Sequence, residues 1–413
     1  MGIEQNHLEN ATNRPLRVLF IPEWYPIRDV HKTSGIPCQE HVRAAAAYCD
    51  VAVLCYTSRK ARWPTLQWES LIDNGIVTFC ATYGKSFIPK TTRQVFSFHL
   101  RRAIHRVIRE WGRPDIIHTQ DGYAYDVIKE IEGLGIPAVI SQHSGALLRG
   151  ELKPEALAKY RWAFARAASV LPANQFALTD YQSRGINAVV RWLPNTLDTA
   201  LFYPPARPDR EAALLHVSSL EPVKRFPDIV RAFKRVVAQR PKAILRVVGG
   251  RHHGAEMESL AARELPPENF HFHGYLSKGE IAELMRSACG LVLASESETF
   301  SCVLMEAMAC ACPVLTTRVG GIPAVVRDGE GLFFDVGNVE QLEKGMLRLI
   351  DRTHGLNTSK ISHEAHSRFS YQTVGLVLRD IYHSAIAATN RRTGRTNYSE
   401  NGVSRGSVND SLA

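Results

Sequence analysis

Cysteines and metal-ligand spacings are scarce in this sequence. Eight cysteines among 413 residues are too few for a disulfide scaffold, and none stands in a CxxC pair. The single close pair, Cys310 and Cys312, has no further ligand at a suitable spacing, so we interpret both as packed thiols. His271 and His273 alternate along an expected strand, again without a third ligand. The sequence therefore indicates neither a disulfide-rich domain nor a zinc site.

Segments that would direct the chain into or across a membrane are also missing. No apolar run approaches the ~18 residues that a membrane span needs. The stretch from Met1 to Arg17 is polar and lacks the apolar core of a secretory signal. Met-Gly opens the chain, but Asn6 leaves the myristoylation pattern incomplete. We therefore expect a cytoplasmic protein.

Acidic residues are fewer than basic ones, with 41 Asp and Glu against 50 Lys and Arg, a net charge of +9. The segment from Lys90 to Arg113 alone holds seven basic residues and one acid. Apolar residues recur along it at helical spacing: Phe96, Leu100, Ile104, Val107, Ile108 and Trp111. Two interpretations stay open. The stripe packs on a sheet while the arginines are solvated, or the basic face also binds an anionic surface at the inner face of a membrane.

The composition is that of a globular protein, with 45% hydrophobic and 22% charged residues, which excludes wholesale disorder, collagen and coiled coil. A single core rarely exceeds ~250–300 residues, so two domains are expected. Short β-branched runs alternate with helical patterns, which predicts parallel sheets of βαβ units. The three prolines Pro204, Pro205 and Pro208 interrupt this alternation of strands and helices.

These patterns predict an α/β protein with two Rossmann-like domains separated by a cleft. The first domain is expected over residues 1–198 and the second over 199–370. We expect a C-terminal helix over 371–389 to complete the first domain. The polar stretch 390–413 is predicted to be a disordered tail. Ligands in such folds bind beyond the carboxyl ends of the strands, so the cleft is the expected site.

Two glutamates separated by seven residues, Glu298 and Glu306, are the strongest chemical signal. The helix expected from about Phe300 is apolar nearly all round, so Glu306 must find cations or ligand hydroxyls inside it. The helix N-terminus between the two carboxylates attracts anions. This arrangement suits a sugar nucleotide. The alternative is a buried glutamate that an arginine elsewhere satisfies.

The same window resembles the EX7E region of glycosyltransferase family 4. The resemblance includes Ala307-Met308-Ala309, Cys312-Pro313-Val314 and Gly320-Gly321-Ile322-Pro323. It extends to the stretches Pro114–His118, Pro194–Asp198 and His216–Arg225, so it covers roughly residues 17–335. It implies the GT-B fold, in which two Rossmann-like domains face each other across a cleft.

The resemblance also implies an activity. The expected enzyme is a retaining, hexosyltransferase-type glycosyltransferase that uses a nucleotide-diphosphate sugar as donor. The acceptor, whether glycan, lipid-linked or small molecule, stays open, with polysaccharide biosynthesis as the expected context. Neither nucleic acid nor a cofactor is expected, and the lack of a DxD-type pair predicts no metal.

Carried onto this sequence, the resemblance implies a set of site residues. The catalytic pair that orients the sugar is His143 and Glu298, and Glu306 anchors the ribose. The donor diphosphate is expected to meet Gly35, Lys224, and the backbone N–H groups of Thr299, Phe300 and Ser301.

The sequence departs from the family pattern at several positions. Ser219 stands where an arginine is usual, and Thr299 and Ser301 replace glycines. Ala324 replaces an acid. Two other functions therefore stay open. One is epimerisation or hydrolysis of a nucleotide sugar without an acceptor, and the other is a catalytically silent nucleotide-sugar-binding partner.

Overall fold

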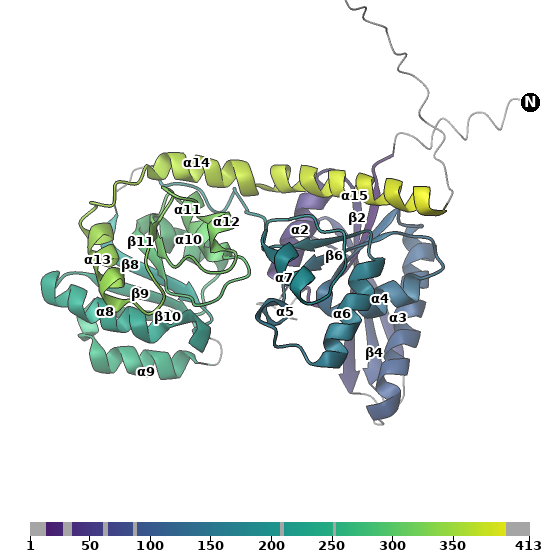
Figure 1. Cartoon of the computed structure of the whole chain (residues 1–413), viewed down its shortest axis with the longest axis horizontal. Coiled ribbons are helices and arrows are strands. Elements are labelled where there is room, and N and C mark those ends of the chain that lie inside the picture. The colour runs from purple at the N-terminus through teal and green to yellow at the C-terminus, as the bar shows by residue number, and fades with distance from the viewer. Residues whose placement is uncertain are drawn as a thin grey trace, which may run out of the picture.

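The computed structural model describes residues 14–27, 35–60, 65–85, 89–206, 210–250 and 253–393. Two sheets lie side by side, each covered by helices, and the helices near the C-terminus run along one side of both (Figure 1). Each sheet is predominantly parallel, so the predicted α/β class with two Rossmann-like domains is confirmed.

The first sheet has seven strands in the order β3-β4-β2-β1-β5-β6-β7. All neighbouring pairs are parallel except β3 and β4, which form an antiparallel edge. The central strands are buried on both faces, which explains their continuous apolar character in the sequence. The strands are β1 (Arg17–Ile21), β2 (Asp50–Lys60), β3 (Leu66–Asp73), β4 (Ile76–Lys85), β5 (Ile116–Gln120), β6 (Ala138–Gln142) and β7 (Ser169–Pro172).

Helices cover both faces of this sheet. They are α2 (Ile36–Ala46), α3 (Pro89–Trp111), α4 (Asp121–Ile131), α5 (Gly145–Arg149), α6 (Pro154–Arg166) and α7 (Ala177–Ser183). On α3 the expected apolar stripe faces the core, with Leu100, Ile104 and Val107 fully buried. The arginines of the opposite face are left at the surface, and Arg101 and Arg102 are exposed.

The second sheet has six parallel strands in the order β10-β9-β8-β11-β12-β13. These are β8 (Glu211–Ser218), β9 (Ile244–Gly249), β10 (Phe270–Gly274), β11 (Ala288–Leu293), β12 (Val314–Thr316) and β13 (Leu332–Phe333). Its helical elements are η1 (Pro222–Lys224), α8 (Phe226–Gln239), α9 (Gly254–Glu264), η2 (Pro267–Asn269), α10 (Lys278–Ser287), α11 (Cys302–Ala309), α12 (Ile322–Val325), α13 (Val339–Ile350) and α14 (Thr358–Phe369).

The last helix, α15 (Tyr371–Thr393), returns to the first domain and packs on α2. The approach is close, because a β-carbon on Gly375 would lie 2.3 Å from the carbonyl oxygen of Ala44. Tyr382 of α15 is buried, and its hydroxyl is hydrogen-bonded to His118 Nδ1 at 2.7 Å. The helix is four residues longer than the expected span 371–389. Residues 394–413 of the predicted tail lie outside the described residues.

Candidate active site

Loops at the carboxyl ends of strands from both sheets meet at one place. His143 follows β6 directly, Lys224 lies in η1 after β8, and Glu298 lies in the loop after β11. A β-carbon on Gly145, two residues after His143, would lie only 3.5 Å from Oγ1 of Thr299. The predicted residues of the two domains therefore face one another, as expected at the carboxyl edges of parallel sheets.

Lys224 and Glu298 form an ion pair at this edge. The ammonium of Lys224 donates to Oε1 of Glu298 at 2.7 Å, and the Ser295 hydroxyl donates to the same oxygen at 2.9 Å. The two side chains are 18% and 10% exposed, so the pair is largely shielded from water. The residue predicted to bind diphosphate and the residue predicted to orient the sugar thus lie within hydrogen-bond distance of each other.

Two glycines hold the loop that carries Glu298. The N–H of Gly321 donates to the carbonyl oxygen of Glu298 at 2.8 Å. A β-carbon on Gly320 would lie 2.0 Å from that same oxygen, and one on Gly321 would lie 2.0 Å from the carbonyl oxygen of Thr299. Gly320 also has φ = 51°, in the left-handed region that favours glycine. The Gly-Gly pair therefore positions the loop through backbone packing.

Phe300 and Ser301 complete the turn into α11. Phe300 is buried, with its ring packed edge-on against Phe369 at 5.9 Å. Ser301 is the N-cap residue of α11, and its side chain forms no capping hydrogen bond in the described structure. The first turn of α11 thus presents backbone N–H groups without a side-chain acceptor from its own cap, which suits the predicted anion contact.

Glu306 lies in α11, next to the interface with the first domain. Burial raises the pKa of this carboxyl, Lys278 lowers it and Glu40 of α2 raises it, with a net pKa of about 7. Lys278, the first residue of α10, donates to Oε1 of Glu40 at 2.7 Å. The cation acting on Glu306 among the described residues is therefore this lysine, and not an arginine as in the alternative interpretation. No pattern in the sequence pointed to Lys278 or Glu40.

His143 is held as a neutral side chain. Burial and, to a smaller extent, the His41 ring 5.8 Å away together lower the pKa of its imidazole to about 3. Its Nε2 atom is buried and has no hydrogen-bond partner among the described residues. A neutral imidazole with a free ring nitrogen can hydrogen-bond a ligand hydroxyl, but it does not carry a second proton, and so no positive charge, near neutral pH.

Gly35 is the N-cap residue of α2 and has φ = 79°. A β-carbon there would lie 2.1 Å from the carbonyl oxygen of Trp24, so the chain needs glycine for its own packing. Residues 28–34 lie outside the described residues. A contact of Gly35 with the donor diphosphate stays a prediction.

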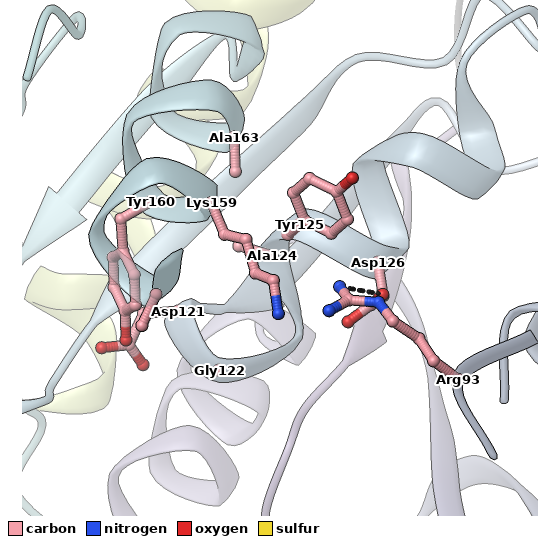
Figure 2. A pocket seen from close by; sticks show the side chains of 10 residues that line it. Arg93, Asp121, Gly122, Ala124, Tyr125, Asp126, Lys159, Tyr160 and Ala163 are labelled. Atoms are coloured by element: carbon pink, nitrogen blue, oxygen red, sulfur yellow. Dashed lines mark hydrogen bonds and ion pairs between the residues drawn. The ribbon is translucent and has the colours of Figure 1, made fainter. Parts of the chain in front are cut away.

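A cavity of about 210 Å³ lies in the first domain, close to the His143 loop. Its lining includes the start of α4 and one face of α6, and Figure 2 shows Lys159 and Tyr160 projecting into it with Asp121. Asp121 accepts hydrogen bonds from the Ser144 N–H at 3.0 Å and from Gln142 Nε2 at 3.4 Å, and burial raises its pKa. Sequence reasoning missed this cavity, although Asp121 directly follows a buried strand at the expected edge.

The part of the chain that the structure describes offers no group of three or more His, Cys, Asp or Glu side chains that could hold a metal ion. None of its helices combines the length and the apolar character that crossing a membrane requires.

Comparison with protein families decides the assignment. Residues 40–201 match the family model described as Glycosyltransferase Family 4, and residues 199–366 match the model described as Glycosyl transferases group 1. The two matches follow each other along the chain and together include both sheets' site loops. The chain belongs to glycosyltransferase family 4.

Curated relatives carry glycosyltransferase names. The chain is 28% identical over 185 residues to N-acetyl-alpha-D-glucosaminyl L-malate synthase of Bacillus anthracis, covering 43% of this chain and 47% of the relative. It is 29% identical over 189 residues to D-inositol 3-phosphate glycosyltransferase of Streptomyces griseus, covering 43% and 40%. The aligned stretches thus span less than half of either relative.

Solved structures confirm the GT-B fold predicted for this family 4 chain. Sucrose-phosphate synthase from Thermosynechococcus elongatus superposes with a TM-score of 0.70 at 21% identity, over 90% of this chain and all of the other. Anabaena HepE, solved with UDP and glucose, superposes with a TM-score of 0.70 at 16% identity, over 89% of this chain and all of the other.

Proposed function

We propose that the protein is a retaining glycosyltransferase that moves a sugar from a nucleotide-diphosphate sugar to an acceptor. The observation that supports this most is the meeting of the His143 loop with the Lys224–Glu298 pair at the carboxyl edges of two sheets. The complex of HepE with UDP-glucose shows that a protein of this fold takes such a donor.

In the proposed mechanism the bond between the sugar's anomeric carbon and the phosphate oxygen breaks. The acceptor oxygen bonds to the same face of that carbon, and its proton passes to the departing phosphate. The protein then mainly positions groups and stabilises charge. Lys224 and the N–H groups of Thr299, Phe300 and Ser301 would stabilise the phosphate. Neutral His143 would hydrogen-bond a sugar hydroxyl.

The acceptor would bind on the side of the first domain, over the cavity beside Asp121. The buried carboxylate of Asp121 can accept hydrogen bonds from hydroxyls, and the ammonium of Lys159 lies 6.0 Å from the Tyr125 ring within the same lining. Two relatives are named for L-malate and D-inositol 3-phosphate, which are small hydroxylated anions. We therefore favour a small, hydroxylated acceptor that carries negative charge.

Turnover of nucleotide sugars with and without acceptors tests the proposed function. We expect sugar transfer from one of the UDP-, GDP- or ADP-sugars, only slow donor hydrolysis without acceptor, and the same rate in the presence of EDTA. The ammonium of Lys224 and the loop N–H groups would stabilise the phosphate charge, which a bridging metal ion does in metal-dependent enzymes. Equal turnover without acceptor would indicate hydrolysis or epimerisation. Donor binding without turnover would indicate a silent partner, and loss of activity in EDTA that Mn²⁺ restores would contradict metal independence.

We further propose that the exposed face of α3 binds an anionic membrane surface. Arg101 and Arg106 are already paired with Glu130 and Glu110, at 2.8 Å and 2.6 Å. The exposed residues that we propose to contact lipid are Arg102, Arg109 and Phe98, the last with 56% of its surface exposed.

Cosedimentation with phosphatidylglycerol vesicles tests this surface. Replacing Arg102 and Arg109 by Gln should weaken binding by roughly tenfold or more at low salt, since each arginine near the surface contributes ~1 kcal/mol. The matched control replaces Lys234 and Arg235, exposed cations of α8, and should bind like the wild type. Binding that ignores both salt and the α3 substitutions would contradict the proposal.

A further inference from the structure

One arginine of the first domain lies beside the loop of the second domain that is predicted to bind the diphosphate. Arg149 is the last residue of α5, the short helix that follows the His143 loop. A β-carbon on Gly145 would lie 2.5 Å from Nη1 of Arg149 and 3.5 Å from Oγ1 of Thr299. Arg149 and Thr299 therefore flank the same glycine, one from each domain.

Arg149 also lies near the loop after β8, because a carboxylate of that loop acts on its guanidinium. The carboxylate of Glu221, three residues before Lys224, acts on the guanidinium of Arg149 and contributes to its raised pKa, after the larger effect of Glu151. The N–H of Lys224 donates to the carbonyl oxygen of Glu221 at 2.8 Å, so Glu221 and Lys224 belong to one turn after β8. Arg149 thus lies within electrostatic reach of both loops predicted to bind the diphosphate.

The second domain by itself offers this site little net positive charge. Lys224 is neutralised by Glu298 at 2.7 Å. Arg225 is shared between Asp228 at 2.7 Å and Glu296 at 3.2 Å. Ser219, directly after β8, contributes only a hydroxyl. A diphosphate carries at least two negative charges, so its binding calls for a cation from elsewhere.

The ion pair of Arg149 with Glu151 does not prevent Arg149 from binding a phosphate. Its guanidinium donates to Glu151 at 2.6 Å and 2.7 Å, but the two side chains are 43% and 53% exposed. Ion pairs at such exposed positions contribute little to stability and exchange readily with water or ligands. A guanidinium is also suited to bidentate contact with phosphate oxygens.

We propose that Arg149 binds the diphosphate of the donor from the first domain and supplies the charge that Ser219 does not. This inference rests on the proposed function. It gives the donor a contact with each domain, Lys224 on one side and Arg149 on the other. The diphosphate would then hold the two domains together while the sugar is transferred.

Calorimetric titration of the full chain with UDP and UMP tests the proposal, with GDP and ADP titrated in parallel. Arg149→Gln should weaken the binding of UDP by about ten- to a hundredfold, the range for a charged hydrogen bond. The affinity for UMP, which lacks the second phosphate, should change less than threefold. Arg235→Gln, which removes an equal charge from an exposed position on α8, is the matched control and should change neither.

Two further variants separate diphosphate binding by Arg149 from the effect of its surface ion pair with Glu151. Glu151→Gln releases the guanidinium and should leave UDP affinity equal or higher. A loss as large as that of Arg149→Gln would assign the effect to the ion pair and overturn the proposal. In the Arg149→Gln background, Ser219→Arg should restore UDP affinity, because it returns a cation to the same site from the second domain.

The outcomes distinguish this inference from the proposed function. If the wild type binds none of UDP, GDP and ADP, the proposed function fails and the role of Arg149 falls with it. If the wild type binds a nucleoside diphosphate but Arg149→Gln binds it equally well, only the role of Arg149 is overturned. Thermal unfolding of each variant checks that the fold is intact.

Discussion

His143→Ala is expected to lower the rate of sugar transfer by a hundredfold or more while nucleotide affinity stays within threefold. The buried Nε2 atom of His143 has no hydrogen-bond partner in the described structure and lies at the end of β6, where the loop meets the second domain. A preorganised hydrogen bond that stabilises the transition state is typically worth about 10²–10³ in rate. Nucleotide contacts come from other residues, so the effect should be confined to turnover.

The neutral state of His143 gives this prediction a second readout. Since burial lowers its pKa to about 3, the imidazole does not titrate between pH 5 and 9. His143→Asn keeps a neutral hydrogen-bonding side chain and should recover part of the activity, without a new pH dependence. His105→Ala, which removes an exposed histidine of α3, is the control. Full activity of His143→Ala would show that the imidazole does not contact the sugar.

Glu306→Ala is expected to weaken nucleotide binding by about 1.5–3 kcal/mol, the usual contribution of hydrogen bonds to a charged group. The carboxylate lies inside the apolar helix α11, where it can accept hydrogen bonds from the ribose hydroxyls. Calorimetric titration at pH 8 measures the loss. An unchanged affinity in a folded Glu306→Ala protein would contradict the predicted role.

The same carboxyl predicts how nucleotide affinity depends on pH. Because burial raises the pKa of Glu306 to about 7, the ionised form that accepts ribose hydrogen bonds is present above that pH and is lost below it. Affinity should therefore fall by about tenfold between pH 8 and pH 6. Glu306→Gln should remove this dependence. Lys278→Met removes the cation that opposes the shift, so its affinity curve should move to higher pH.

The contribution of Glu306 to stability should fall as pH rises, whereas its contribution to nucleotide affinity should rise. In the unfolded chain Glu306 ionises near 4.5, whereas in the folded protein it keeps its proton until about pH 7. The folded state therefore binds more protons between these values, and the free energy of unfolding of the nucleotide-free protein should fall as pH rises through this range. Denaturant unfolding of the wild type and of Glu306→Gln at pH 5 and pH 8 checks this, since the variant should lack this part of the change.

Local sequence pattern determined the architecture of this protein. Alternating β-branched runs and helical periods predicted two parallel sheets, because strand and helix periodicity are properties of neighbouring residues. The apolar stripe of α3 identified its buried face for the same reason. The window from Glu298 to Glu306 could be interpreted from the sequence alone. A carboxylate inside an apolar helix is unfavourable in free energy unless it has a partner or a ligand.

Only the tertiary structure decided what those residues contact. The pair Lys224–Glu298 joins residues 74 positions apart, and the Lys278–Glu40 contact crosses between domains over 238 positions. Neither the neutral state of His143 nor the raised pKa of Glu306 follows from a pattern along the chain, because both depend on how much protein surrounds the group. The cavity beside Asp121 and the place of Arg149 opposite Thr299 depend on which loops the two sheets bring to a common edge. Sequence periodicity specifies which elements form, whereas burial and contacts between distant residues arise only when those elements pack.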